Sequence, residues 1–179
     1  MRDLNTREQY VNYITYDTRI ASKEDFIVSS CTGKRVLDIG CIDHNLETVS
    51  SLKNKWMHHQ ISLVADEITG VDILEEEAAY LNKHGYNIVV ADILNLDLRC
   101  KFDVIVAGDI IEHISSFDHF FVSLKRHMHQ DSIAIITTPN PFNIEQTFLA
   151  IFDNRLYVHD QHVAWLDPRV MWELASVCP

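Results

Sequence analysis

Short apolar runs alternate with helix-type patterns between residues 34 and 140. The runs are rich in Val and Ile, and most lack the apolar–polar alternation of a half-exposed strand. We therefore predict strands that are buried on both faces, as in a parallel sheet covered by helices. The five predicted strands are RVLDIG (35–40), EITGVDI (67–73), YNIVVAD (86–92), FDVIVAG (102–108) and SIAIITT (132–138).

Helical spacing of apolar residues separates these strands. One pattern runs from Leu46 to Trp56, and a second runs from Leu74 to Leu81 and stops near Gly85. A third contains Phe117, Phe120, Phe121, Leu124 and Met128 after a capping Ser115 or Ser116. Strands that alternate with helices in this way predict an α/β fold with a doubly wound, Rossmann-like sheet and helices on both faces.

Composition narrows the possible partners and the setting. The chain has 179 residues, a net charge of −11 and no basic patch, which argues against nucleic acid as a partner. Its four cysteines show no CxxC pair, which is typical of reduced, intracellular thiols. The polar start MRDLNTREQYVNYITYD contains no secretory signal, and no apolar run is long enough to span a membrane. We therefore expect a cytoplasmic protein.

Polar residues follow each predicted strand, at the edge where open α/β sheets bind their ligands. An acid after the second strand, Asp72, can accept hydrogen bonds from both ribose hydroxyls, and Asp92 after the third can accept from an adenine amine. Gly40 lets the backbone approach a ligand closely. Each Asp could instead be a helix cap or turn former, and Asp38 could merely hold the next loop. The order and joint occurrence of these residues indicate an adenosine site.

The motifs VLDIGC, GVDI, VVADILNLDL, FDVIVAGDIIEHI and IITTPNPF resemble those of class I S-adenosylmethionine-dependent methyltransferases, in the branch acting on small molecules, ubiquinone-type acceptors and surface glycans. The resemblance covers about residues 30–175 and implies strand order 3-2-1-4-5 with S-adenosyl-L-methionine as the cofactor. It implies roles for the strand-end residues. Asp38, Gly40 and Cys41 would hold the methionine part, Asp72 with Ile73 the ribose, and Asp92 with Ile93 the adenine, while Asp109 would border the sulfonium and the acceptor.

The chain departs from the family pattern in three places. Ile42 and His44 occupy the second and third glycine positions of the first turn, and the insert KNKWMHHQISLVAD lengthens the first crossover, which a surface would tolerate. The family's sixth and seventh strands are not evident, so strand five would be an exposed edge through which a homodimer could form.

We expect one domain in three parts. Residues 1–33 form an N-terminal helical segment, 34–140 the cofactor-binding core, and 141–179 a substrate-side segment. The last part contains a helix within PFNIEQTFLAIFDN, an irregular stretch or short strand in RLYVHDQHVAWL, and a helix that Asp167 caps. The abrupt end at SVCP indicates either a fragment or a degenerate ending.

Methyl transfer to a hydroxyl acceptor is helped by a base, and histidines are the candidates. His113 follows strand four at the mouth of the site and is the first candidate; His162 is the second. His159, Asp160 and His162 also suggest a metal site, but a short His-x-x-His pair is weak support and we predict no metal ligand. His58, His59, His127 and His129 are interpreted as solvated helix faces, and Tyr10, Tyr13 and Tyr16 as a packing stripe.

Three functions compete. The first is an S-adenosylmethionine-dependent methyltransferase that acts on a small molecule, a glycan or a lipid-linked acceptor. The second is a non-catalytic module with a methyltransferase-like fold, which the thinned glycine turn favours. The third is a nicotinamide-dependent oxidoreductase; Ile42 and His44 argue against it, because a dinucleotide requires a glycine-rich turn.

Overall fold

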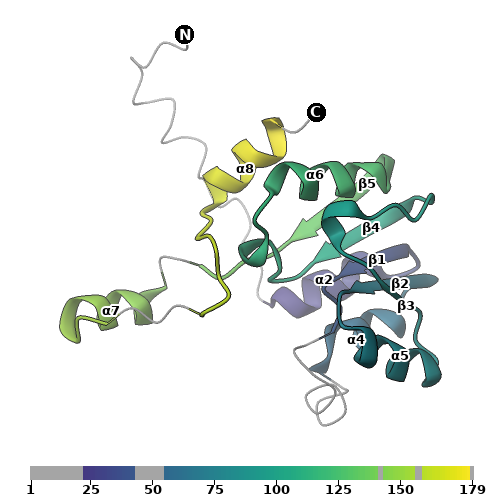
Figure 1. Ribbon diagram of the computed structural model, residues 1–179, viewed down its shortest axis with the longest axis horizontal. Helices are drawn as coiled ribbons and strands as arrows, with labels where there is room; N and C mark the ends of the chain where they lie inside the picture. The colour runs from purple at the N-terminus through teal and green to yellow at the C-terminus, as the bar shows by residue number, and fades with distance from the viewer. Residues whose placement is uncertain (1–21, 43–54, 141–142, 156–158, 178–179) are drawn as a thin grey trace.

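A computed structural model describes residues 22–42, 55–140, 143–155 and 159–177. These residues form a five-stranded sheet with the order β3-β2-β1-β4-β5, in which all neighbouring strands are parallel (Figure 1). The strands are β1 (Arg35–Ile39), β2 (Glu67–Asp72), β3 (Ile88–Val90), β4 (Phe102–Ala107) and β5 (Met128–Ile136). The predicted strands and their order are confirmed.

The central strand, β1, sets the position of the carboxyl edge of the sheet. Val36, Leu37, Asp38 and Ile39 are all buried, as expected for a strand covered on both faces. Ile39 pairs with Val71 of β2 on one side and with Ala107 of β4 on the other. The three strands therefore end at the same level, and the residues that follow them lie along one edge of the sheet.

Helices cover both faces of the sheet, as predicted. One face carries α2 (Lys23–Cys31), α4 (Met57–Ser62) and α5 (Glu75–Lys83), and the other carries α6 (Phe117–Arg126) and α8 (Pro168–Val177) (Figure 1). Alternate strand residues separate the two cores, because successive side chains point to opposite faces. Val36 and Val104 pack with Ile27 of α2, whereas Leu37 and Ile105 pack in the core that contains Phe120 of α6.

Local chemistry explains the helix ends. Asp72 Oδ1 accepts the N–H groups of Ile73 and Leu74, directly before α5. That helix is followed by Gly85 at φ +92°, which confirms the predicted stop. Asp167 Oδ1 accepts the N–H groups of the second and third residues of α8, and the predicted cap is confirmed. Ser116 precedes α6 but makes no side-chain capping bond.

Several local predictions are wrong. Met128 begins β5 instead of ending the third helix, because α6 stops at Arg126. His58 and His127 are not solvated: both are fully buried. Nitrogen atoms of His127 bond to the Ser123 carbonyl and the Leu98 N–H group, which satisfies its ring inside the core.

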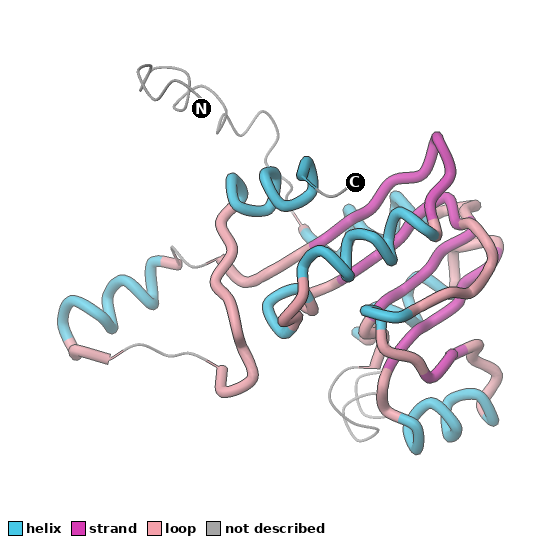
Figure 2. Tube along the Cα trace, turned by 45° about the horizontal axis from the view of Figure 1, so that its top comes forward, coloured by secondary structure: helices cyan, strands magenta, loops and turns pink. Residues whose placement is uncertain are grey.

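The chain after β5 takes a less compact course. Helix α7 (Ile144–Phe152) has no buried residue and lies apart from the sheet in both views (Figures 1 and 2). Residues 159–166 contain no helix or strand, in keeping with the irregular stretch predicted there. No sixth or seventh strand occurs among the described residues, and β5 is an edge strand. None of the described helices combines the length and apolar character that crossing a membrane requires.

Candidate functional site

A cleft of about 760 Å³ opens at the carboxyl ends of β1, β2 and β4. A smaller hollow of about 250 Å³ adjoins it and extends to the end of β3. Gly40, Asp72, Ile73 and His113 line both of them. The larger cleft lies within the size range of small-molecule sites in proteins.

The predicted cofactor residues come together around this space. Those that line the larger cleft are Asp38, Gly40, Cys41, Asp72, Ile73 and Asp109. Asp92 and Ile93 line the smaller hollow, after β3. Of the two predicted bases, His113 lines both hollows, and the ring centroid of His162 lies 4.8 Å from that of His113. His44 lies outside the described residues, as do the three tyrosines of the predicted packing stripe.

Gly40 forms the turn at the end of β1. Its φ is +67°, and an added Cβ would lie 2.6 Å from Ile110 Cδ1. Its N–H donates to the Val71 carbonyl at 2.8 Å, which ties the turn to β2. A side chain at this position would therefore strain the backbone and push Ile110, which lines both hollows.

Asp72 organises the turn as well as facing the cleft. Its Oδ2 accepts the Ile42 N–H at 2.9 Å, and its Oδ1 accepts two N–H groups at the start of α5. A carboxylate has about four acceptor positions, so one position remains for a ligand hydroxyl. The side chain of Ile42 packs into the core with Trp56 and Leu81, so its backbone N–H carries the link to Asp72.

Asp38 forms a buried pair with His58 beneath the cleft. His58 Nδ1 lies 2.9 Å from Asp38 Oδ2, and the two side chains are 0% and 6% exposed. The other ring nitrogen, Nε2, is buried with no partner among the described residues. This pair supports the alternative that Asp38 stabilises the local structure. Asp38 also lines the wall of the cleft.

Cys41 sits beside this pair and is buried. Burial raises the pKa of its thiol, and the charges of Asp38 and Asp72 raise it further. The thiol is therefore neutral and unreactive at neutral pH. Trp56 Nε1 donates to the Cys41 carbonyl at 2.6 Å, which fixes the turn from the opposite side.

Asp92 and Asp109 occupy exposed positions at the rim. Asp92 Oδ1 accepts the Leu94 N–H and so caps the short 3₁₀ helix η2 (Ile93–Asn95). Asp109 adopts φ +49°, accepts the Thr137 hydroxyl and pairs with Lys23 Nζ at 2.6 Å. Lys23 therefore brings the start of α2 to the end of β4.

Histidines gather at the mouth with one acid. His113 ends the 3₁₀ helix η3 (Ile111–His113), and its Nδ1 lies 3.2 Å from the Gln161 carbonyl. Because a carbonyl only accepts, the neutral ring carries its proton on Nδ1 and leaves the Nε2 lone pair available. Burial and the neighbouring His113 lower the pKa of His162, so its ring is neutral at neutral pH.

Sequence reasoning missed several of these contacts. Trp56, Lys23 and Gln161 line the cleft but come from the insert, the N-terminal segment and the irregular stretch. Sequence reasoning also missed the close packing at Gly70, where an added Cβ would lie 2.6 Å from Cys41 Sγ. In the sequence, Gly70 is marked only by its position in the motif GVDI. That motif does not indicate that the Cys41 side chain packs against this glycine.

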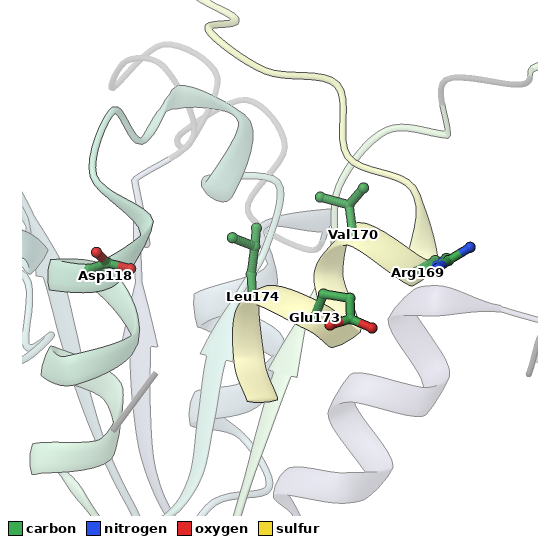
Figure 3. A pocket seen from close by; sticks show the side chains of 5 residues that line it. All are labelled: Asp118, Arg169, Val170, Glu173 and Leu174. Carbon is green, nitrogen blue, oxygen red and sulfur yellow. The ribbon is translucent and has the colours of Figure 1, made fainter. Parts of the chain in front are cut away.

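Another hollow, of about 280 Å³, lies between α6 and α8 (Figure 3). Its walls come from Asp118 on α6 and from four residues of α8, among them Val170 and Leu174. None of the strand-end residues lines it. The cleft at the carboxyl ends therefore remains the candidate site.

The chain belongs to a family described as "Methyltransferase domain", whose family model matches residues 7–174. This match covers most of the chain and agrees with the sheet order and the position of the cleft. The family resemblance predicted from the motifs is confirmed.

Curated relatives include methyltransferases of small molecules. A ubiquinone biosynthesis O-methyltransferase of Rickettsia conorii is 23% identical over 140 residues, which are 75% of this chain and 45% of that protein. The (S)-coclaurine N-methyltransferase of Thalictrum flavum is 22% identical over 58% of this chain and 28% of its own length. The chain thus spans less than half the length of these relatives.

Solved structures share the fold. The plantazolicin methyltransferase BpumL, solved in complex with SAH, has a TM-score of 0.60 and 24% identity over 84% of this chain and 59% of its own. An S-adenosylmethionine-dependent methyltransferase from Clostridium acetobutylicum has a TM-score of 0.55 and 18% identity over 78% and 58% of the two chains. These likenesses confirm the Rossmann-like methyltransferase fold.

Proposed function

We propose that this protein binds S-adenosyl-L-methionine at the carboxyl edge of its sheet and transfers the methyl group to a small molecule. The observation that carries the proposal is the set of residues around the two adjoining hollows. Successive strand ends supply Asp38, the Gly40 turn, Asp72 and Asp92 in the order that an adenosyl ligand requires. Membership of the methyltransferase family supports the same reading.

The residues present fit this cofactor. Gly40 adopts φ +67°, a conformation that side chains rarely allow, and Ile110 packs directly against its Cα, so the turn stays narrow where it lines the cleft. Asp72 keeps one acceptor position for a ribose hydroxyl, since its other three are used by backbone N–H groups. Asp92, with Ile93, would receive the adenine, and Asp38, with Gly40 and Cys41, would receive the methionine part.

The bound cofactor supplies an electrophilic methyl group on a sulfonium. The chain's task is to position the acceptor in line with that methyl group and to exclude water, and positioning alone can contribute about 7–11 kcal/mol in favourable cases. The carboxylates of Asp38 and Asp72 in the cleft wall would favour a cationic ligand, whereas Asp109 is already paired with Lys23. For a hydroxyl acceptor, we propose His113 Nε2 as the base that takes the proton, because Nδ1 bonds the Gln161 carbonyl, and His162, whose ring lies against that of His113, as the second candidate.

The acceptor class follows from the relatives and the cleft together. Relatives named for ubiquinone biosynthesis and for (S)-coclaurine methylate small molecules at oxygen or nitrogen. The exposed apolar residues of α7, in the segment that we propose to face the acceptor, would suit an apolar or lipid-linked acceptor. We propose an acceptor of this kind, and a hydroxyl as its reacting group.

Several wider proposals accompany this function. We propose one domain over residues 1–179, with the core at 34–140 binding the cofactor and 141–179 facing the acceptor. We further propose a cytoplasmic protein that does not bind nucleic acid, which its net charge of −11 supports. The exposed residues of β5 support a homodimer through that edge.

Isothermal titration of the whole chain with S-adenosylhomocysteine tests the central proposal. We expect one equivalent to bind, and we expect Asp72→Asn and Asp92→Asn each to weaken binding at least about tenfold, because a charged hydrogen bond contributes about 1.5–3 kcal/mol. Asp97→Asn is the matched control, since Asp97 accepts only a local bond from the Arg99 N–H and lines neither hollow. Absence of saturable binding would leave the non-catalytic module as the better account.

A further inference from the structure

We propose that Glu112, His113 and His162 form a binding site for one divalent transition-metal cation, such as Zn²⁺ or Co²⁺, at the mouth of the cleft. Each of these residues offers one ligand atom, and the three atoms lie within 4.8 Å of one another. Glu112 and His113 come from η3, whereas His162 comes from the irregular stretch. The site thus depends on two segments that are far apart in the sequence.

The carboxylate of Glu112 is the strongest sign of a missing partner. The residue is 1% exposed, and its Oε2 is buried without a hydrogen-bond partner among the described residues. A buried carboxylate oxygen without a partner costs several kcal/mol, so it requires a proton or a cation. Neither of the two neighbouring imidazole rings donates a hydrogen bond to that oxygen. Together with the carboxylate, the two rings form a set of three metal ligands.

Both imidazoles are suited to bind a metal. Hydrogen bonding of His113 Nδ1 to the Gln161 carbonyl leaves Nε2 as the ligand atom and orients the ring, which is the usual arrangement behind a metal-bound histidine. The rings of His113 and His162 meet edge to face, with centroids 4.8 Å apart and an interplanar angle of 80°.

A backbone hydrogen bond joins the two segments that carry the ligands. The Val163 N–H donates to the Glu112 carbonyl at 2.9 Å. Val163 directly follows His162, and Glu112 directly precedes His113, so this bond lies next to the ligands on both segments. Ligand atoms of a tetrahedral zinc site lie about 3.4 Å apart, since each lies about 2.1 Å from the metal. The three ligand atoms now lie within 4.8 Å of one another, so a bound cation would draw them closer together.

Two histidines and one carboxylate select the class of cation. Nitrogen and carboxylate oxygen suit Zn²⁺ and its first-row neighbours, whereas Mg²⁺ and Ca²⁺ prefer oxygen ligands alone. Three protein ligands also leave at least one coordination position open, as in catalytic sites and unlike closed structural ones.

The open position gives the cation a role, and this step rests on the proposed function. His113 lines both hollows, so the cation would lie at the border of the cofactor cleft and could bind an acceptor oxygen. The histidines would then be ligands and not bases, because a metal occupies the lone pair that a proton would take. The cation itself would lower the pKa of the bound hydroxyl.

Titration of the chelator-treated full chain with CoCl₂ tests the site, without any cofactor or acceptor. We expect one equivalent of Co²⁺ to bind and to give a visible absorption band of nitrogen and oxygen ligation. His162→Ala and Glu112→Gln should each weaken Co²⁺ binding at least about tenfold. Replacing a residue that only supports a metal ligand already lowers metal affinity by about this factor. His84→Gln is the matched control, because this exposed histidine bonds the Tyr80 carbonyl on α5.

The outcomes separate clearly. Absence of saturable binding, or equal binding by the wild type and His162→Ala, would overturn the proposal. His162 lies in an irregular stretch, so its variant keeps the core intact and decides the question even if Glu112→Gln fails to fold. Co²⁺ binding is independent of S-adenosylhomocysteine binding, and failure of one proposal therefore leaves the other measurable.

Discussion

At the scale of single residues, Gly40 shows how one position joins fold and site. Its backbone lies in the left-handed region, and Ile110 occupies the space where a side chain would begin. Ile110 in turn lines both hollows. A change at Gly40 therefore reaches the ligand space through a neighbouring side chain, without altering any polar group.

We expect Gly40→Ala to lower the free energy of unfolding by about 1–3 kcal/mol and to weaken S-adenosylhomocysteine binding at least about tenfold. Gly33→Ala is a matched control, because Gly33 has φ +64° but no atom within 4 Å of an added Cβ. Gly33→Ala should strain the backbone without pushing a neighbouring side chain, and it should leave S-adenosylhomocysteine binding unchanged. Urea unfolding and isothermal titration measure the two effects, and equal binding by both variants would contradict this account.

Cys31 links a single buried thiol to the pH dependence of stability. Burial raises its pKa from 9.0 to about 12, and the charge of Asp38 adds to the rise. Below pH 9 the thiol is protonated in both folded and unfolded chains, so it adds no pH dependence. Between pH 9 and about 12 the unfolded chain ionises first, so the free energy of unfolding falls.

Cys31→Ala removes this thiol while leaving the other titrating groups in place. Between about pH 8 and about pH 10 we expect the wild type to lose about 1 kcal/mol more stability than the variant, after allowance for solvent screening. Urea unfolding at each pH measures the difference. Parallel curves for the two proteins would show that the thiol stays protonated equally in both states.

The strand-end residues were predictable from sequence for a geometric reason. Parallel strands end at one edge, so Asp38, Asp72 and Asp92 had to approach a common space once the strand order was inferred. The cluster of Glu112, His113 and His162 was not predictable in this way. His162 belongs to a stretch without helix or strand, and no periodicity fixes where such a stretch folds back.

At the scale of elements, the insert in the first crossover does more than lengthen a surface loop. It forms α4, and Trp56, His58 and Ile61 are buried there. Trp56 fixes the turn carbonyl of Cys41, and His58 supports Asp38. The insert thus supplies structural support at the first turn, where the chain has Ile42 in place of a family glycine.

We expect His58→Ala to lower the free energy of unfolding by about 3–5 kcal/mol, because it leaves the Asp38 carboxylate buried without its partner. Adding Asp38→Asn should recover part of the loss by removing the unpaired charge. His59→Ala, on the same helix, should cost about 1 kcal/mol, since His59 is only half-buried and bonds the Tyr86 hydroxyl. Urea unfolding compares the variants, and equal losses from His58→Ala and His59→Ala would refute the buried pair as a stabilising unit.

The element errors share one physical origin. The strands could be identified because a strand that is buried on both faces appears in the sequence as a continuous apolar run. No comparable pattern distinguishes a buried histidine from an exposed one. His58 and His127 are buried only because partners lie far along the chain, at Asp38 and at Leu98. Met128 fits a helical stripe equally well, and its place in β5 depends on pairing with Phe102.

At the scale of the whole molecule, the carboxyl edge of the sheet and its side edge at β5 have different surroundings. The carboxyl edge gathers charged residues and the cleft, while the side edge at β5 remains unpaired among the described residues. The burial pattern of β5 is mostly exposed, unlike the central strands. An uncovered edge of this kind invites pairing with a second copy, since its backbone groups lack partners.

The proposed homodimer places β5 of one copy antiparallel to β5 of another around a two-fold axis. Ile133 is 48% exposed on this strand, and Ile133→Lys would put a charge at the contact, which natural edge strands use to prevent pairing. Sedimentation over about a hundredfold range of concentration should show a dimer for the wild type and a monomer for this variant. Leu63→Lys is the matched control, because Leu63 is 72% exposed after α4, outside the strand. A wild type that remains monomeric at the highest concentration, or an Ile133→Lys variant that still dimerises, would remove β5 as the interface.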